Sequence, residues 1–115
     1  MKLKIFSYDT VDSTNETAKR LIKSTKYEKG FVHALSQKKG KGRYGSKWIS
    51  KRGNFFGTIF FHIKNSYPSV EEFTIINSIL NIDILSEYCG KKRTFFKSPN
   101  DIYINKKKYA EYCRK

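Results

Sequence analysis

The segment from Gln37 to Trp48 holds the residue types best suited to binding an anion. It reads Gln-Lys-Lys-Gly-Lys-Gly-Arg-Tyr-Gly-Ser-Lys-Trp and interleaves glycines with cations. Glycines let the backbone turn and present successive N–H groups to phosphate oxygens, and Arg43 can hold two such oxygens at once. Trp48 adds a flat face for stacking. The segment matches neither the P-loop nor the dinucleotide-binding glycine pattern, so a solvated surface loop and an RNA-binding loop remain alternatives.

Two further segments gather small polar side chains. Asp12-Ser13-Thr14-Asn15 stands at a predicted helix start, and Lys97-Ser98-Pro99-Asn100-Asp101-Ile102-Tyr103 is followed shortly by Lys108. Taken alone, the first is an ordinary helix N-cap and the second an ordinary turn.

The first half of the chain predicts a strand, a helix and two more strands. Leu3–Tyr8 alternates apolar and polar residues as a half-buried strand does. Ser13 and Glu16 form a capping box, and the helix that it opens should end before Gly30. Phe31–Ser36 predicts a strand, and Asn54–Ile63 a largely buried one. The residues from Gln37 to Lys47 have no period and predict a loop.

The second half predicts a helix and three short strands. A second capping box, Ser69 with Glu72, opens a helix, and Gly90 is a suitable end for it. One face of that helix is lined by Phe73, Ile76, Leu80, Ile84 and Tyr88. Phe95-Phe96 predicts a short strand. Ile102–Ile104 and Lys107–Tyr112 predict a hairpin around Asn105-Lys106. The order β-α-β-β-α-β-β-β indicates a mixed α/β layer rather than a bundle or a sandwich.

Composition narrows the classes of protein. The chain has 115 residues, a size typical of one domain, and its longest apolar run, near Phe55–Ile63, is too short to span a membrane. No signal peptide is recognisable and the two cysteines form no disulfide or metal framework, so we expect a reduced, cytoplasmic protein. The net charge of +14 suggests an anionic partner such as nucleic acid. Much of the excess lysine is equally explained by AT-rich codons.

Taken together and in this order, the three polar segments resemble the catalytic domain of biotin–protein ligases. That family reads Asp-Ser-Thr-Asn, then Gln-x-x-Gly-Arg-Gly-Arg-x-Gly-Arg-x-Trp, and later Lys-Trp-Pro-Asn-Asp with a lysine after it. A fourth element of the family, Ser-Pro-x-Gly-x-Asn-Leu-Tyr-x-Ser, is matched with one residue missing by the segment from Ser50 to Thr58. The resemblance runs from Val11 to about Ala110.

The resemblance implies a fold, a reaction and a set of site residues. The fold would be of the α/β kind, α+β in type: a mixed β-sheet with helices packed on it, like class II synthetases. The reaction would join biotin to ATP, giving biotinyl-5′-adenylate, and then transfer biotin to a lysine of a biotin carboxyl carrier domain of a carboxylase. Biotin and ATP would be the substrates, and Mg²⁺ the metal. No DNA or membrane partner is expected.

By the same resemblance, each motif residue carries an implied role. The ureido ring of biotin would face four polar residues, Ser13, Thr14, Asn15 and Gln37. The biotin carboxylate and the α-phosphate would meet Lys41, Gly42, Arg43 and Lys108, of which Arg43 and Lys108 are the implied catalytic residues. The nucleotide would contact Gly40, Lys41, Arg43, Trp48, Asn100 and Asp101. Asp101 would help to hold Mg²⁺.

The sequence also departs from the family pattern. Lys41 and Ser46 stand where arginines are usual, and Ser98 stands where the family has tryptophan. After Ala110 the family continues Gly-Ile-Leu, whereas this chain reads Glu-Tyr-Cys-Arg-Lys. Loss of one base from codons for Gly-Ile-Leu would give Glu-Tyr-Cys, which is our hypothesis for this ending. Residues 1–115 are therefore expected to be the N-terminal part of a catalytic domain, truncated before its final strands. The helix-turn-helix domain of some relatives, the rest of the catalytic domain and the small C-terminal barrel would be missing.

Three other interpretations stay open on the sequence. The chain can be a non-catalytic biotin-binding remnant, which would bind biotin without releasing pyrophosphate. It can be a small basic nucleic-acid-binding protein, whose binding would fall steeply with salt. A lipoate ligase shares the fold but fits the glycine-rich loop less well. A sheet that stops early would leave an unpaired edge strand, and self-association through that edge is expected.

Overall fold

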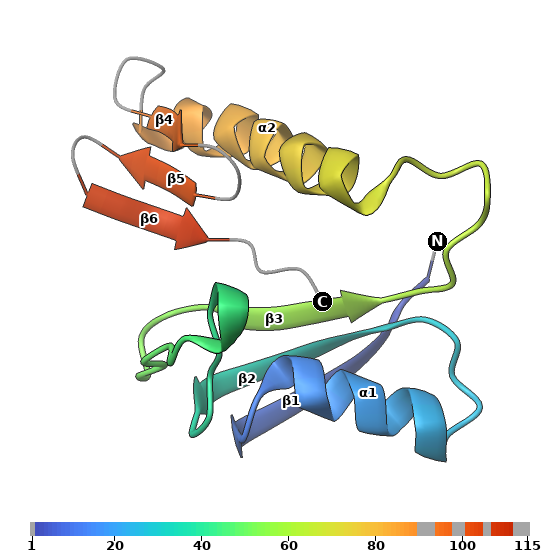
Figure 1. The fold of residues 1–115 in the computed structure, drawn as a ribbon. Helices are drawn as coiled ribbons and strands as arrows, with labels where there is room; N and C mark the ends of the chain where they lie inside the picture. Colours follow the sequence, from blue (N-terminus) through green and yellow to red (C-terminus); the bar gives the residue numbers. More distant parts are fainter. Residues whose placement is uncertain (1, 90–93, 98–100, 105–106, 112–115) are drawn as a thin grey trace. The chain divides into compact units, whose positions relative to one another are not determined.

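The computed structural model describes residues 2–89, 94–97, 101–104 and 107–111 of the chain (Figure 1). The chain forms two units, Met1–Lys64 and Asn65–Lys115, and each is described by itself. The helices and strands predicted for the two halves of the chain are present in the predicted order, β-α-β-β-α-β-β-β, with a short 3₁₀ turn added between the second and third strands. Gly90, Asn100 and the Asn105-Lys106 turn lie outside the described residues.

The first unit is a three-stranded sheet that carries one helix. β1 (Lys4–Val11) and β2 (Gly30–Gln37) run parallel, and α1 (Thr14–Ser24) connects them. A parallel pair requires such a crossover connection. β3 (Phe56–Phe60) pairs antiparallel with β2, so β2 is the central strand. The predicted strand-helix-strand-strand order of this half is confirmed.

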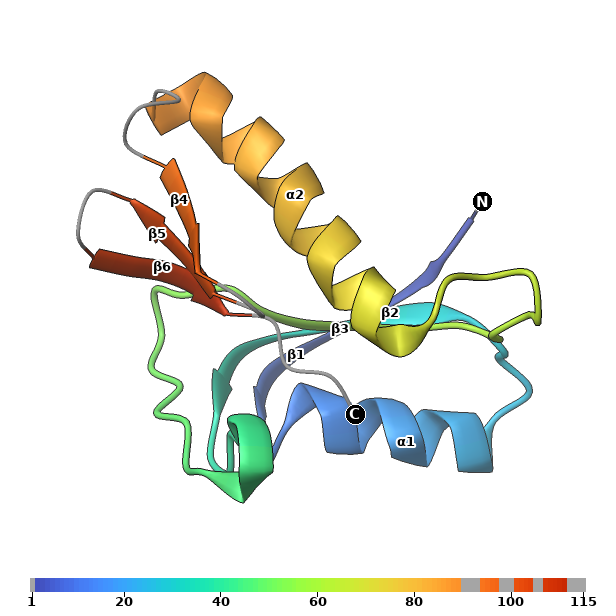
Figure 2. The same ribbon diagram turned by 45° about the horizontal axis from the view of Figure 1, so that its top comes forward.

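The core of the first unit lies between α1 and one face of the sheet. Its buried residues are Ala18, Val32 and Phe60, and Phe6 and Leu21 pack against them. The strand register places Phe6 opposite Val32, so both side chains point to the same face. Figure 2 shows α1 running along that face.

The strand predicted over Asn54–Ile63 is shorter and less buried than expected. β3 covers only Phe56–Phe60, and its exposed and buried positions alternate. Phe60 is 6% exposed, whereas Ile59 is 55% exposed. The expectation of a largely buried strand is therefore wrong. The physical reason is that α1 covers one face of this antiparallel strand, so only alternate residues reach the core.

The second unit is a helix packed on a three-stranded antiparallel sheet. α2 (Val70–Cys89) contacts β4 (Thr94–Lys97) and β5 (Asp101–Ile104), and β5 also pairs with β6 (Lys107–Glu111). The predicted hairpin and the predicted strand around Phe95-Phe96 are confirmed. A register shift between Ile102 and Tyr103 marks an irregularity in the β5–β6 pairing.

The second capping box opens α2 as predicted. The Glu72 N–H donates to Ser69 Oγ at 3.2 Å, and the Ser69 N–H donates to Glu72 Oε2 at 2.9 Å. The buried residues of α2 are Ser78 and Ser86, however, while Leu80 and Ile84 of the predicted apolar row are more than half exposed. The predicted apolar row is thus not the covered part of the helix, whose buried positions are two serines outside that row.

Candidate functional site

The start of α1 brings the first group of predicted site residues into a buried position. Ser13 is the N-cap, and its Oγ accepts a hydrogen bond from the Glu16 N–H at 3.4 Å. Ser13 and Thr14 are almost fully buried and Asn15 is half-buried. The predicted N-cap is confirmed. The cap fixes the backbone from which Thr14 and Asn15 project.

The end of β2 brings Gln37 against this helix start. Gln37 Oε1 accepts a hydrogen bond from the Thr14 N–H at 2.8 Å and lies 3.1 Å from Thr14 Oγ1. Because a backbone N–H can only donate, the bond fixes which end of the Gln37 amide carries the oxygen. Gln37 and Thr14, more than twenty residues apart in the sequence, thus form one polar cluster.

Two residues that the motif reading did not assign to the site complete this cluster. Ser50 Oγ accepts from Gln37 Nε2 at 2.9 Å and donates to the Trp48 carbonyl at 3.2 Å. Thr58 Oγ1 lies 2.8 Å from Thr14 Oγ1 and 2.7 Å from Asn15 Oδ1. The available signal was a threonine within an otherwise apolar strand, at a position that alternation places on the helix-bearing face.

The glycine-rich loop is an ordered excursion between β2 and β3. It is closed by backbone bonds from the Gly42 N–H to the Ser46 carbonyl and from the Trp48 N–H to the Gly40 carbonyl. At its apex a short 3₁₀ turn, η1 (Arg43–Gly45), has positive φ at Tyr44 (58°) and Gly45 (75°). The sequence predicted an aperiodic loop here, and the structure shows a short hairpin-like turn with its own hydrogen bonds.

Gly40 is the glycine for which the loop has no alternative. A Cβ at this position would lie 2.5 Å from Ser50 Oγ and 2.6 Å from the Trp48 carbonyl oxygen. Contacts this short do not occur for real side chains, so the loop can close over Ser50 and Gln37 only because position 40 has no side chain. A Cβ at Gly42, which is also a predicted site residue, would lie 2.6 Å from Ser46 Oγ.

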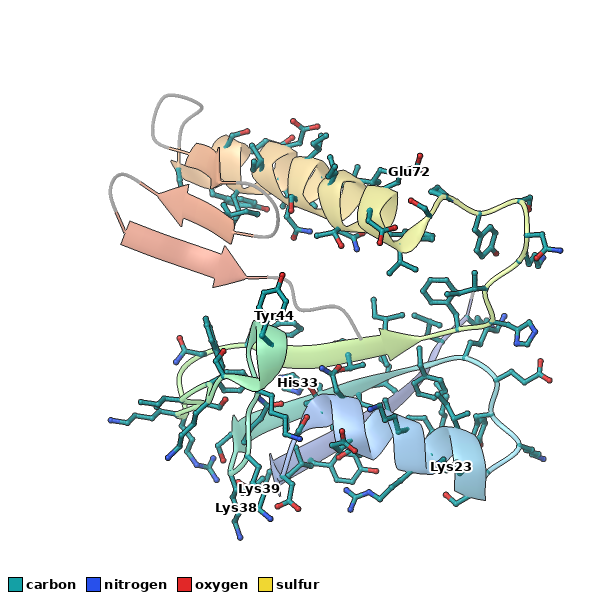
Figure 3. All side chains as sticks on the ribbon, viewed as in Figure 1. Lys23, His33, Lys38, Lys39, Tyr44 and Glu72 are labelled. Carbon is teal, nitrogen blue, oxygen red and sulfur yellow. The ribbon has the colours of Figure 1, made fainter. Side chains whose placement is uncertain are left out.

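The cations of the loop project from this frame. Lys38, Lys39 and Lys41 are exposed, and Figure 3 shows Lys38 and Lys39 beyond the end of β2. Lys41 stands opposite Lys47 in an antiparallel bridge, so two like charges share one end of the loop. Such a pair is destabilising on its own, and an anion placed between them would relieve the repulsion. Trp48 is half-buried in the same loop.

The remaining predicted residues belong to the second unit or lie outside the description. Asp101 begins β5 and Lys108 lies in β6, and the structure describes their backbone only. For Arg43, in the loop of the first unit, the structure likewise describes the backbone only. Asn100 lies outside the described residues altogether. Within the described part of the chain, no cluster of three or more His, Cys, Asp or Glu could hold a metal ion.

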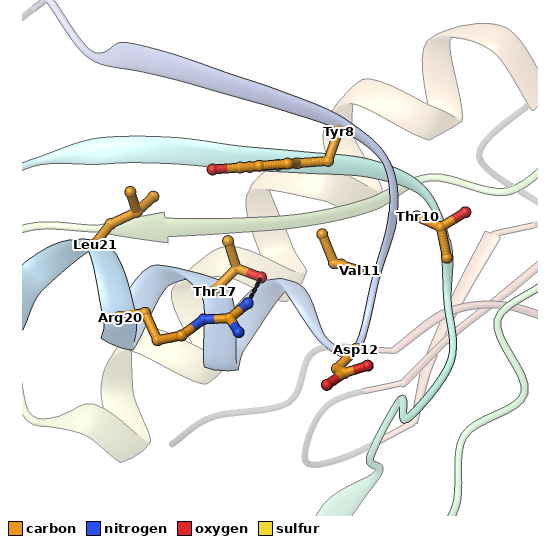
Figure 4. A pocket seen from close by; sticks show the side chains of 7 residues that line it. All are labelled: Tyr8, Thr10, Val11, Asp12, Thr17, Arg20 and Leu21. Carbon is orange, nitrogen blue, oxygen red and sulfur yellow. Dashed lines mark hydrogen bonds between the residues drawn. The ribbon is translucent and has the colours of Figure 1, made fainter. Parts of the chain in front are cut away.

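A pocket that no motif indicated lies between β1 and α1 (Figure 4). Its volume is about 430 Å³. The lining residues are Tyr8, Thr10, Val11, Asp12, Thr17, Arg20 and Leu21. The Arg20 guanidinium donates to Thr17 Oγ1 at 3.2 Å. None of the predicted site residues lines this pocket.

Among the described helices, none is long and apolar enough to cross a membrane.

The described residues form an α+β fold with a partly buried polar cluster beside a glycine-rich basic loop. The family model of the biotin/lipoate A/B protein ligases matches residues 7–110. The chain therefore belongs to the biotin/lipoate A/B protein ligase family, and the resemblance noted from the motifs is confirmed.

Individual relatives agree with this assignment. A biotin–[acetyl-CoA-carboxylase] ligase of Paracoccus denitrificans is 31% identical over 100 residues, which are 86% of this chain and 41% of the relative. The structure of the Aquifex aeolicus biotin protein ligase with biotin and ATP is 27% identical, with a TM-score of 0.74 over 91% of this chain and 43% of that one.

The fold is also shared with a more distant structure. The Leishmania major biotin protein ligase with biotin has a TM-score of 0.78 at 22% identity, over 94% of this chain and 49% of that one. The predicted α+β class, a mixed sheet with helices, is confirmed by these likenesses. The chain spans about half the length of the relatives that it matches or less.

Proposed function

We propose that this chain acts as a biotin–protein ligase and supplies biotin-binding residues of the site. The observation that carries the proposal is the polar cluster formed by the buried Thr14 and the half-buried Asn15 and Gln37. Such a cluster suits the ureido ring of biotin, which needs both donors and acceptors in a dry pocket. The family membership and the relatives named for biotin support the same ligand.

The reaction that we propose has two steps. A carboxylate oxygen of biotin attacks the α-phosphorus of ATP, the bond to pyrophosphate breaks, and biotinyl-5′-adenylate forms. The amine of a carrier-domain lysine then attacks the acyl carbon and AMP leaves. The first step gathers negative charge, so the loop cations Lys41 and Arg43 would hold the carboxylate and the α-phosphate. Lys108 would assist them.

By the family resemblance, the nucleotide would contact the residues named for it in the sequence motifs. At Gly40 and Gly42 the loop backbone would approach the phosphates, because neither residue has a side chain. Trp48 would pack near the adenine. Asn100 and Asp101 would lie near the phosphates, and Asp101 would hold Mg²⁺. Phosphate oxygens and water would complete the coordination of the ion, as is usual for Mg²⁺. We place the reaction in the cytoplasm, on a carboxylase carrier domain.

The test is product formation by the purified chain. Incubation with biotin and Mg-ATP should release pyrophosphate and leave biotinyl-5′-adenylate on the protein. Biotin binding without pyrophosphate release would support the non-catalytic biotin-binding interpretation instead. Binding to RNA or DNA that is indifferent to biotin would support the nucleic-acid interpretation and contradict the proposal.

A further inference from the structure

Thr58 is held against both residues at the start of α1. It lies in β3, opposite Val32 of β2, and is half-buried. Its Oγ1 is 2.8 Å from Thr14 Oγ1 and 2.7 Å from Asn15 Oδ1. A single hydroxyl of β3 therefore joins two neighbouring residues of the helix that packs on its strand.

The direction of these hydrogen bonds follows from the number of hydrogens available. Asn15 Oδ1 can only accept, so the Thr58 hydroxyl is the donor in that bond. Thr14 Oγ1 donates its hydrogen to Gln37 Oε1 at 3.1 Å, and the two lone pairs of that oxygen let it accept the Thr14 N–H at 2.8 Å as well. Thr14 Oγ1 therefore acts as an acceptor toward Thr58. The Thr58 hydroxyl thus donates toward the start of α1, and its shorter contact is with Asn15.

These bonds determine what the cluster can offer to a ligand. With Oδ1 held by Thr58, the Asn15 amide turns its two N–H hydrogens away from that bond, and no hydrogen bond among the described residues engages them. Gln37 Nε2 uses one hydrogen on Ser50 and keeps the other. Thr14 has donated its hydrogen and can only accept. The cluster offers amide donors from two residues and a hydroxyl acceptor from a third.

We infer that Thr58 is a specificity-determining positioning residue, which orients the Asn15 amide so that the site binds a carbonyl oxygen flanked by N–H groups. The inference rests on the proposed function, because the ligand class is the cyclic urea of biotin. Thr58 acts through Asn15 and Thr14 and needs no contact with the ligand. Without its hydroxyl, the Asn15 amide is free to turn over and present an acceptor instead of a donor.

The test compares two ligands that differ at the relevant atom. In 2-iminobiotin the carbonyl oxygen of the urea is replaced by nitrogen, and the group is protonated at pH 7, so it only donates. Wild-type protein should bind biotin more tightly than 2-iminobiotin. In Thr58→Val, which keeps the side-chain shape, the preference for biotin should fall about tenfold, the typical worth of one hydrogen bond. Thr58→Ser, which keeps the hydroxyl, should retain the wild-type preference.

The ratio of the two affinities separates positioning from a merely structural role. If Thr58 only stabilises β3, Thr58→Val should weaken both ligands equally, and an unchanged ratio in a folded variant would overturn the inference. Thr58→Ala gives a second route to the same ratio should the valine variant not fold. A wild-type chain that is folded but binds neither ligand would contradict the proposed function itself, and the inference with it.

Discussion

Gln37 occupies the position on which the rest of the polar cluster depends. Its amide oxygen satisfies the first backbone N–H of α1, and its amide nitrogen binds Ser50 in the loop. One side chain therefore connects the helix start to the glycine-rich loop. A change at Gln37 should affect both stability and ligand binding, because the same amide serves both.

We expect Gln37→Leu to destabilise the chain by about 1–3 kcal/mol, since a buried N–H at Thr14 would lose its acceptor. Denaturant unfolding of the two proteins measures the difference. Lys38→Ala is the matched control, because Lys38 is the adjacent exposed residue, and its free energy of unfolding should change by less than about 0.5 kcal/mol. Equal stability of Gln37→Leu and wild type would contradict the assigned bond.

Gly40 gives a second prediction for a single residue. Gly40→Ala places a Cβ against Ser50 Oγ and the Trp48 carbonyl, so the loop must shift and stability should fall by about 1–3 kcal/mol. Biotin affinity should fall as well, because Ser50 holds the Gln37 amide. Thermal unfolding and a biotin titration measure the two effects. An alanine variant that is indistinguishable from wild type in both would refute the close contact.

The motifs identified some of these residues and missed others for a definite reason. Thr14, Asn15 and Gln37 stand in motifs with a recognisable spacing, and the structure does bring Thr14 and Gln37 into contact. Ser50 and Thr58 stand at the two ends of the fourth family element, but no site role was assigned to them. Their contacts with the cluster depend on pairings between strands and loop that local spacing does not encode. The β2–β3 register had to be known before Thr58 could be placed near Thr14.

At the scale of elements, the two capping serines offer a matched pair of variants. Ser13 caps α1 next to the proposed site, and Ser69 caps α2 in the second unit. Ser13→Ala and Ser69→Ala should each cost about 1 kcal/mol of stability, because each leaves a helix N–H without its acceptor. Only Ser13→Ala should also weaken biotin binding, since the two residues that follow it belong to the cluster.

The comparison is made by unfolding and by biotin titration on both variants. A loss of affinity in both would mean that global stability, rather than the position of the α1 start, controls binding. A loss in neither would mean that the cap has no bearing on the site.

The order of elements could be predicted because each has local signals. Both helices begin at a capping serine, and most of the strands follow runs that contain Phe, Ile or Val. The extent of burial could not be predicted, because it depends on which faces are covered. The apolar residues around β3 were expected inside, yet Ile59 and Phe55 are largely exposed. Similarly, the apolar pattern of α2 did not reveal that Ser78 and Ser86 are its buried residues.

At the scale of the whole molecule, positive charge is distributed unevenly along the sequence. No Asp or Glu occurs between Lys29 and Val70, a stretch that contains the whole glycine-rich loop. Arg52 in this stretch forms an ion pair with Asp9, whereas no ion pair of the described residues involves Lys41 or Lys47. The exposed cations of the loop are therefore available to an anionic ligand, and their effect should be screened by salt.

We expect Lys41→Ala to weaken ATP binding by about tenfold or more, the worth of a charge-assisted hydrogen bond to phosphate. Lys64→Ala removes the same charge from an exposed position outside the loop and should change the affinity by less than about twofold. Titrations at low and moderate salt measure both variants. Equal losses would show that net charge, and not the position of Lys41, attracts the nucleotide.

The most direct test of the account is calorimetric titration of the folded 115-residue chain with biotin. The account predicts saturable binding of one biotin per chain, and loss of that binding in Gln37→Leu under conditions in which the variant remains folded. A folded wild-type chain that gives no binding, or a Gln37→Leu variant that binds biotin as wild type does, would contradict the claim that this polar cluster is a biotin site.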